Sequence, residues 1–191
     1  MLSAFDVAEY FLCKVDEDVG DLISNLKLQK LLYYAQGRHL AILGRPLFGQ
    51  AVFAWEHGPV VADVYRAYKD CGFNAIPRPQ HPKTSNITSE SKGLLDEVYE
   101  VYGQYSAWKL RNMTHEEPPW LYTPHDAVIS IDKMKSFFRT QLVDIPEREQ
   151  WLWGNDEALA SVMRGIEQAA QGQTEDLGSF AEFADISIDD D

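Results

Sequence analysis

The chain has 191 residues, of which 45% are apolar, enough to bury one hydrophobic core with a small appendage. Its net charge of −13 argues against nucleic-acid binding, which depends on neutralising phosphates with Lys and Arg. No run approaches the roughly 20 apolar residues of a membrane span, and residues 1–20 lack the basic start of a secretion signal. Two isolated cysteines argue against a disulfide framework. We therefore expect a cytoplasmic protein with neither nucleic acid nor membrane as a partner.

The first predicted helix begins at Ser3, with Asp6 in its first turn as in a capping box. Residues 25–43 form the least polar long helix, and their apolar side chains make two stripes on different sides. A helix at the rim of a fold needs only one such stripe. Residues 25–43 are therefore predicted to be the central helix of the fold, with Asn25 capping its start and Gly44 just past its end.

The middle of the chain predicts further helices separated by clear breaks. After a short apolar stretch, Gly58 and Pro59 punctuate the sequence, and Pro59 suits the first turn of a helix that runs to Gly72. Residues 73–88 hold three prolines and no periodicity, so we expect the main loop there. Further helices are predicted to begin at Ser89, Ser106 and Ser130. No convincing run of alternating strands is present, and the fold class is mainly α.

Residues 143–191 read as an extension of the helical domain formed by residues 1–142. Asn155 caps a predicted amphipathic helix that Gly172 closes. Residues 165–191 hold 8 acids and no Lys or Arg, yet the end of the chain also carries two Phe and two Ile. A tail meant only to be solvated has little use for such side chains. We therefore predict a compact multi-helix domain with a C-terminal helix and an acidic tail that docks on its own core or on a partner.

Motifs of catalysis are absent: neither a Walker pattern, G-x-G-x-x-G, G-x-S-x-G nor H-E-x-x-H occurs. The five histidines are scattered, and no spacing requires a metal site. Glu116 and Glu117 are adjacent, and adjacent helical side chains point about 100° apart, so we interpret them as a helix end facing water. Cys71 is read as a small core residue. We predict no catalytic residue, no cofactor and no metal.

Two local groupings remain to be explained. Residues 54–60 place a tryptophan before a tight turn, and residues 106–120 end a helix at a histidine, two prolines and a second tryptophan. Buried Trp and His side chains usually serve packing and donate their N–H groups to nearby carbonyls. We therefore predict structural roles for Trp55, Gly58, Pro59, His115, Pro119 and Trp120.

In the same order, three motifs resemble the Panacea domain of SocA-like antitoxins and phage-associated proteins. They are Leu-Gln-Lys-Leu-Leu-Tyr-Tyr-Ala-Gln at residues 28–36, Ala-Trp-x-x-Gly-Pro-Val at residues 54–60 and the Ser-Ala, Thr-His and Pro-Trp pairs within residues 106–120. The resemblance covers roughly residues 4–138. It implies a mostly helical domain that binds and neutralises a protein toxin encoded beside it. Residues 160–180 loosely resemble the ends of Phd-type antitoxins, where a helix and an extended tail wrap the toxin.

The sequence and these resemblances together predict an antitoxin that acts by stoichiometric binding and not as an enzyme. The expected partner is a cognate toxin with a basic surface, and homo-oligomerisation stays open. Alternatives are a protease adaptor that delivers a client, a small hydrolase or transferase using His115, His57 or Cys71, and a DNA-binding autoregulator. The predicted toxin contacts are apolar anchors and acids of the tail, namely Phe180, Phe183, Ile186, Ile188, Asp176, Glu182 and Asp185.

Overall fold

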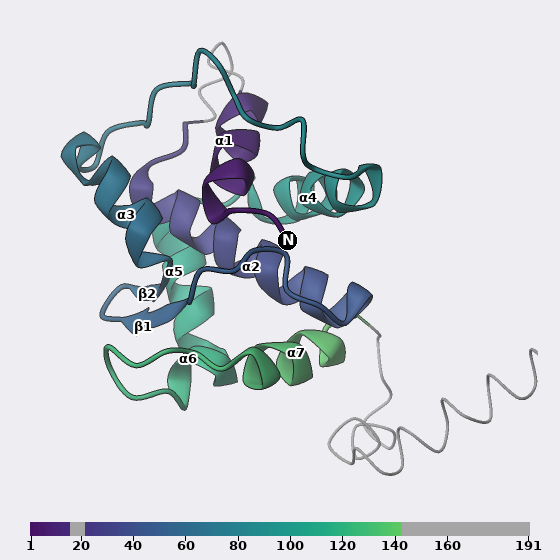
Figure 1. The fold of residues 1–191 in the computed structure, drawn as a ribbon. Coiled ribbons are helices and arrows are strands. Elements are labelled where there is room, and N and C mark those ends of the chain that lie inside the picture. The colour runs from purple at the N-terminus through teal and green to yellow at the C-terminus, as the bar shows by residue number, and fades with distance from the viewer. Residues whose placement is uncertain (16–21, 143–191) are drawn as a thin grey trace, which may run out of the picture. The chain divides into compact units, whose positions relative to one another are not determined.

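The computed structural model describes residues 1–15 and 22–142, and these residues lie within one compact unit, Met1–Glu147. They are mostly helical, which confirms the predicted mainly α class (Figure 1). The predicted C-terminal helix and tail lie outside the described residues. In chain order the elements are α1 (Ala4–Lys14), α2 (Asn25–Leu43), β1 (Phe53–Trp55), β2 (Gly58–Val60), α3 (Ala62–Tyr68), a 3₁₀ turn (Lys69–Cys71), α4 (Ser89–Tyr102), α5 (Ala107–Glu116), α6 (Pro118–Leu121) and α7 (Ile131–Thr140).

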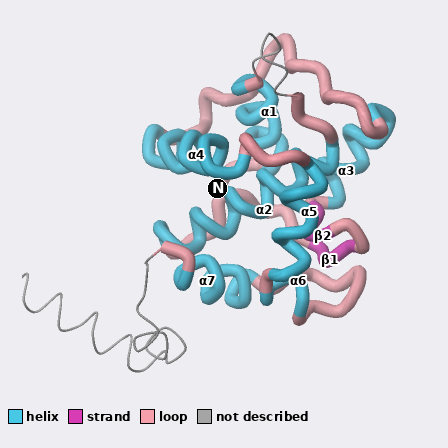
Figure 2. The backbone as a smooth tube through the Cα atoms, turned by 180° about the vertical axis from the view of Figure 1, so that it is seen from behind, coloured by secondary structure: helices cyan, strands magenta, loops and turns pink. Residues whose placement is uncertain are grey.

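Helix α2 is the centre of the described fold, as its two apolar stripes predicted. Of its 19 residues, 15 are buried. Figures 1 and 2 show α1 and α4 on one side of α2 and α6 and α7 on the opposite side, and α2 contacts α1, α3, α4, α5, α7 and strand β2. None of the helices within the described ranges is long and apolar enough to cross a membrane.

Polar side chains on α2 bind the loops that surround it. The side-chain oxygen of Gln36 accepts hydrogen bonds from the backbone N–H groups of Leu47 (2.9 Å) and Phe48 (3.2 Å), and its amide donates to the Phe48 carbonyl (3.1 Å). The side-chain oxygen of Gln29 likewise accepts from the backbone N–H of Val61 (2.9 Å). Because buried backbone groups need partners, these two glutamines let α2 be enclosed on all sides.

The ends of α2 correct one detail of the prediction. Ser24 is the N-cap, and its hydroxyl accepts from the backbone N–H of Lys27; Asn25 is the first helical residue. Asn25 does not cap the helix because it already lies within it: its amide donates to the Tyr65 carbonyl at 3.0 Å, across to α3, and its side-chain oxygen accepts from the Gln29 amide at 3.0 Å. At the other end Gly44 adopts a left-handed conformation with φ of 69°, which confirms its predicted role as the terminator.

Strands β1 and β2 form a short antiparallel hairpin that the sequence did not predict. Ala54 pairs with Pro59 and Trp55 with Gly58. Pro59 therefore lies in a strand, and the prediction that it opens a helix was wrong, because α3 begins only at Ala62. Strands of three residues are too short to give an alternating pattern that can be recognised in a sequence.

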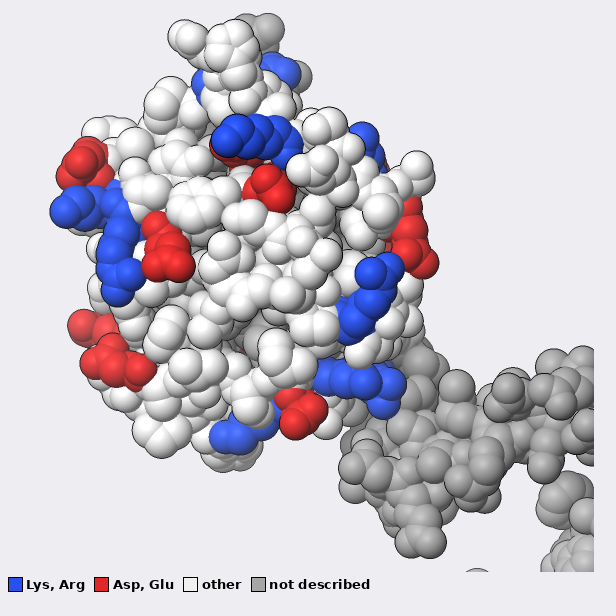
Figure 3. Space-filling model, in the orientation of Figure 1, with Lys and Arg blue, Asp and Glu red and all other residues white. Residues whose placement is uncertain are grey.

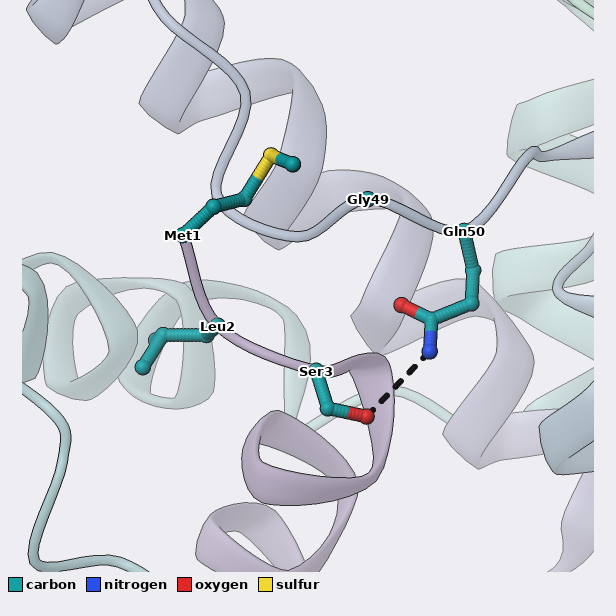
Figure 4. Close-up of a pocket in the computed structure, with 5 residues that line it drawn as sticks. All are labelled: Met1, Leu2, Ser3, Gly49 and Gln50. Carbon is teal, nitrogen blue, oxygen red and sulfur yellow. Dashed lines mark hydrogen bonds between the residues drawn. The ribbon is translucent and has the colours of Figure 1, made fainter.

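The start of α1 is anchored to the loop before β1 at an open hollow of about 490 Å³ (Figure 4). Ser3 forms the predicted capping box, with its backbone N–H donating to the Asp6 carboxylate at 2.9 Å. The side chain of Gln50 accepts from the backbone N–H of Ala4 (2.9 Å) and donates to the Ser3 hydroxyl (3.2 Å). These hydrogen bonds fix the start of α1 to the loop before β1.

Candidate functional site

Exposed aromatic side chains gather around one groove in the described domain. The groove has a volume of about 550 Å³ and is lined by the start of α2, the hairpin, α3 and the segment after it, and the start of α5. Phe73 is fully exposed, Trp108 is 58% exposed and Tyr65 is 38% exposed. Contiguous exposed apolar surface of this kind marks interaction sites on soluble proteins. We call this feature the aromatic groove, defined by Trp55, Tyr65, Phe73 and Trp108.

Trp108 is held in a defined position at the edge of the aromatic groove. Ser106 caps α5 through its hydroxyl, which places Trp108 in the first turn of that helix. The Trp108 ring meets the His57 ring edge-on at 6.0 Å, and the Arg111 guanidinium lies 6.0 Å from the ring centroid. These contacts order an exposed aromatic side chain before any partner arrives.

The glycine of the hairpin turn allows close packing beside the aromatic groove. Gly58 has a φ of +97°, and a Cβ atom there would lie 2.7 Å from the Thr114 hydroxyl oxygen and 2.8 Å from Cε of Lys30. The Lys30 ammonium in turn donates to the Pro59 carbonyl at 2.9 Å. A side chain at this position would therefore push the hairpin away from α2 and α5.

The second motif ties the hairpin to α5 and α6. The indole N–H of Trp120 donates to the Trp55 carbonyl at 2.9 Å, as expected for a buried tryptophan. The His115 ring stacks on the Trp120 ring at 3.7 Å, and Pro119 is buried in α6. The structure thus brings the predicted motif residues together at one junction, which is consistent with their proposed structural roles.

Four basic side chains lie close together at this junction. Burial lowers the pKa of Lys30 to about 7, with a further contribution from the charge of Arg111. Burial also lowers the pKa of His115 to about 4, and the charges of Arg111, Lys30 and His57 act in the same direction. The Nε atom of Arg111 and Nε2 of His115 are buried without a hydrogen-bond partner among the described residues. We call Lys30, His57, Arg111 and His115 the basic cluster.

The two adjacent glutamates were interpreted as a helix end facing water, and for Glu117 this interpretation was wrong. The chain turns inward between α5 and α6, and the Tyr34 hydroxyl donates to the Glu117 carboxylate at 2.9 Å. Burial raises the pKa of Glu117 to about 7, although the hydrogen bond from Tyr34 opposes that shift. Sequence reasoning also missed Lys30, whose only signal was a charge inside an otherwise apolar stretch.

The reactive groups of the junction are engaged in packing. The Lys30 side chain is fully buried with its ammonium bound to a backbone carbonyl, and the His115 ring is covered by Trp120. Within residues 1–15 and 22–142, no three His, Cys, Asp or Glu side chains are placed to hold a metal ion together. The residues of the tail that were predicted to contact a toxin, from Asp176 to Ile188, lie outside the described residues.

Part of this domain is similar to known proteins. Residues 28–121 match the family described as antitoxin SocA-like, Panacea domain. The curated protein Antitoxin SocA of Caulobacter vibrioides (strain NA1000 / CB15N) is 54% identical over 50 residues, which is 26% of this chain. The match spans only about a quarter, 27%, of the length of that relative. No solved structure matches the chain.

The fold and the junction define a small, mainly α domain in which a hairpin and a short helix close over one buried central helix. The matched residues include most of α2, the hairpin and α3 to α6, and hence take in every element of the junction. Residues 28–121 therefore correspond to the Panacea domain of SocA-like antitoxins.

Proposed function

We propose that the chain is an antitoxin that neutralises a cognate protein toxin by direct, stoichiometric binding. The observation that carries this proposal is the SocA-like Panacea domain at residues 28–121, together with a relative named as an antitoxin. The aromatic groove supports a binding role, because exposed Trp and Tyr side chains dominate the energetics of protein interfaces. The proposed site of action is the cytoplasm.

The acidic C-terminal tail is proposed to contact the toxin. Toxins that attack RNA or ribosomes need basic active sites, so an acidic segment would block such a site and also speed association. Ordering a long tail costs free energy, and a few anchors must therefore supply most of the affinity. Phe180 and Phe183 are the leading anchors, supported by Ile186 and Ile188.

Catalysis by the chain is not part of the proposal. An enzyme using His115 and His57 would need to present them to a substrate, whereas the His115 ring stacks on Trp120. A protease adaptor would also bind its client, so binding alone does not separate adaptor from antitoxin. Toxin lifetime in cells with and without the protease separates them: an antitoxin that acts by binding leaves that lifetime unchanged.

The proposal is tested by expressing the product of the adjacent gene with the wild-type chain or a variant. We expect the wild-type chain to restore growth and to purify with the toxin. Phe180→Ala/Phe183→Ala should weaken both effects, whereas Ile42→Ala, at an exposed apolar residue on α2 away from the aromatic groove, should not. Full rescue by a chain lacking residues 173–191 would remove the tail from the mechanism and return attention to the helical domain.

A further inference from the structure

We propose that the aromatic groove binds a segment of the toxin in which an aromatic side chain lies next to an Asp or Glu. This role rests on the proposed antitoxin function and deepens it, since it assigns the face of the helical domain that meets the toxin and the chemistry which that face selects. The binding site is formed by described residues alone.

The walls of the aromatic groove fit an aromatic anchor. Phe73 and Trp108 expose large apolar surfaces, and Trp55 meets Tyr65 edge-on at 5.2 Å on the wall formed by the hairpin and α3. The volume of about 550 Å³ lies within the range of roughly 300–1,000 Å³ that is typical of binding pockets. An aromatic ring placed among these side chains would make the stacked and edge contacts that aromatic pairs prefer.

Two helices begin at the aromatic groove. Asn25 and Leu26 are the first two residues of α2, Ala107 and Trp108 are the first two of α5, and all four line the groove. Backbone N–H groups in the first turn have no acceptor inside their own helix. The serine that precedes each helix accepts from the third helical residue and not from the first two. The positive ends of two helix dipoles therefore meet at this groove.

Neither helix carries an acidic residue that would neutralise its positive end. Among the described helices longer than four residues, α1, α3, α4 and α7 each have an acid in the first turn, whereas α2 and α5 have none. Each helix start is equivalent to about half a positive charge. The charges of Lys69 and Glu56 in the lining cancel, so the groove keeps roughly one unit of positive charge. An Asp or Glu beside the aromatic anchor complements that charge.

The charge of the aromatic groove also argues against a second copy of this chain as its occupant. A symmetric dimer through the groove would bring two positively charged grooves together, because both partners use the same patch. On the face shown in Figure 3, the described residues carry interspersed acids and bases around an uncharged area, without an extended patch of one sign. Selection of a partner by charge therefore depends on local features such as the two helix ends.

The first test measures the affinity of the full-length chain for the purified product of the adjacent gene by calorimetry. Trp108→Ala and Phe73→Ala should each weaken binding at least about tenfold, as expected for central aromatic anchors. Phe73 is fully exposed, so its replacement leaves the fold intact. The matched control is Tyr122→Ala, at an aromatic residue that is 69% exposed outside the groove lining, and it should bind like the wild type.

The second test changes the charge of the aromatic groove. Lys69→Glu should weaken binding by about two- to fivefold, and Glu56→Gln should strengthen it by a similar factor, as expected for exposed charges. Lys83→Glu makes the same charge change in the loop before α4, outside the groove lining, and should leave the affinity unchanged. Equal affinities for Lys69→Glu and Lys83→Glu would contradict the acidic chemistry of the bound segment.

The third test identifies the bound segment with a photo-crosslinking amino acid in place of Phe73, in the complex with the same toxin. We expect crosslinks to toxin peptides in which an aromatic residue lies within two positions of an Asp or Glu. Crosslinks only between copies of this chain, only within one chain, or only to toxin peptides without such a pair would each overturn the inference.

The outcomes separate this inference from the proposed function. A toxin that binds Phe73→Ala and Trp108→Ala as tightly as the wild type removes the groove from the interface and leaves neutralisation by binding intact. A toxin that does not bind the wild-type chain removes both.

Discussion

Replacing Gly58 with Ala tests the close packing of the hairpin against the central helix. The added Cβ would lie 2.7 Å from the Thr114 hydroxyl oxygen and 2.8 Å from Cε of Lys30, and it would sit on a backbone with φ of +97°. A non-glycine residue in a sparsely populated backbone region costs about 1–3 kcal/mol. Overpacking a buried contact adds about 1–3 kcal/mol. We expect Gly58→Ala to lower the free energy of unfolding by about 3 kcal/mol, within the summed range.

The matched control is the same substitution at Gly93, in the interior of α4, where no atom lies within 4 Å of the added Cβ. Gly93→Ala should raise the free energy of unfolding by about 0.5–1 kcal/mol, since Ala favours the helix. Urea denaturation followed by far-UV circular dichroism measures both changes. A loss below about 1 kcal/mol for Gly58→Ala would show that the hairpin moves aside freely, and the requirement for glycine would be refuted.

Three further predictions address the buried polar groups. Between pH 7 and 9 the unfolded chain keeps a proton on Lys30 that the folded chain loses. The free energy of unfolding should therefore rise by about 2 kcal/mol over this range in the wild type but not in Lys30→Met. Equal shifts of the urea midpoint in the two proteins would contradict the lowered pKa of Lys30. Trp120→Phe removes the hydrogen bond to the Trp55 carbonyl and should destabilise by about 1 kcal/mol in thermal denaturation, and an unchanged midpoint would count against that bond. Gln36→Leu leaves three buried backbone groups unpaired and should destabilise by about 3 kcal/mol. Gln104→Leu, at an exposed glutamine, should stay within about 0.5 kcal/mol, and similar losses for both variants would show that burial is not the cause.

The sequence predicted the centre of the fold well because the signal there is physical and local. The two apolar stripes of residues 25–43 required packing on several sides, and α2 has those bounds and is buried along most of its length. The capping roles of Ser3 and Gly44 were also predictable because they depend on local geometry. The Ser3 side chain caps the first turn of α1, and Gly44 adopts the left-handed backbone conformation that ends α2. Asn25 was misassigned because two residues that can both cap a helix, Ser24 and Asn25, are adjacent, and the structure uses the first.

The candidate site was much less predictable. Trp55 and Trp120 were predicted to serve packing, and the indole N–H of Trp120 donates to the Trp55 carbonyl. The aromatic groove was not foreseen, because its walls come from four parts of the chain and its aromatic residues lie far apart in sequence. Lys30 and Glu117 carry strongly perturbed pKa values only because tertiary packing removes them from water.

The most direct test of the central proposal is to mix the purified chain with the purified product of the adjacent gene, and to measure complex formation by calorimetry and toxin activity in the same samples. The proposal predicts one defined complex and a loss of toxin activity that follows the fraction bound. A toxic neighbour that stays fully active while bound, or that never binds the chain at all, would contradict it.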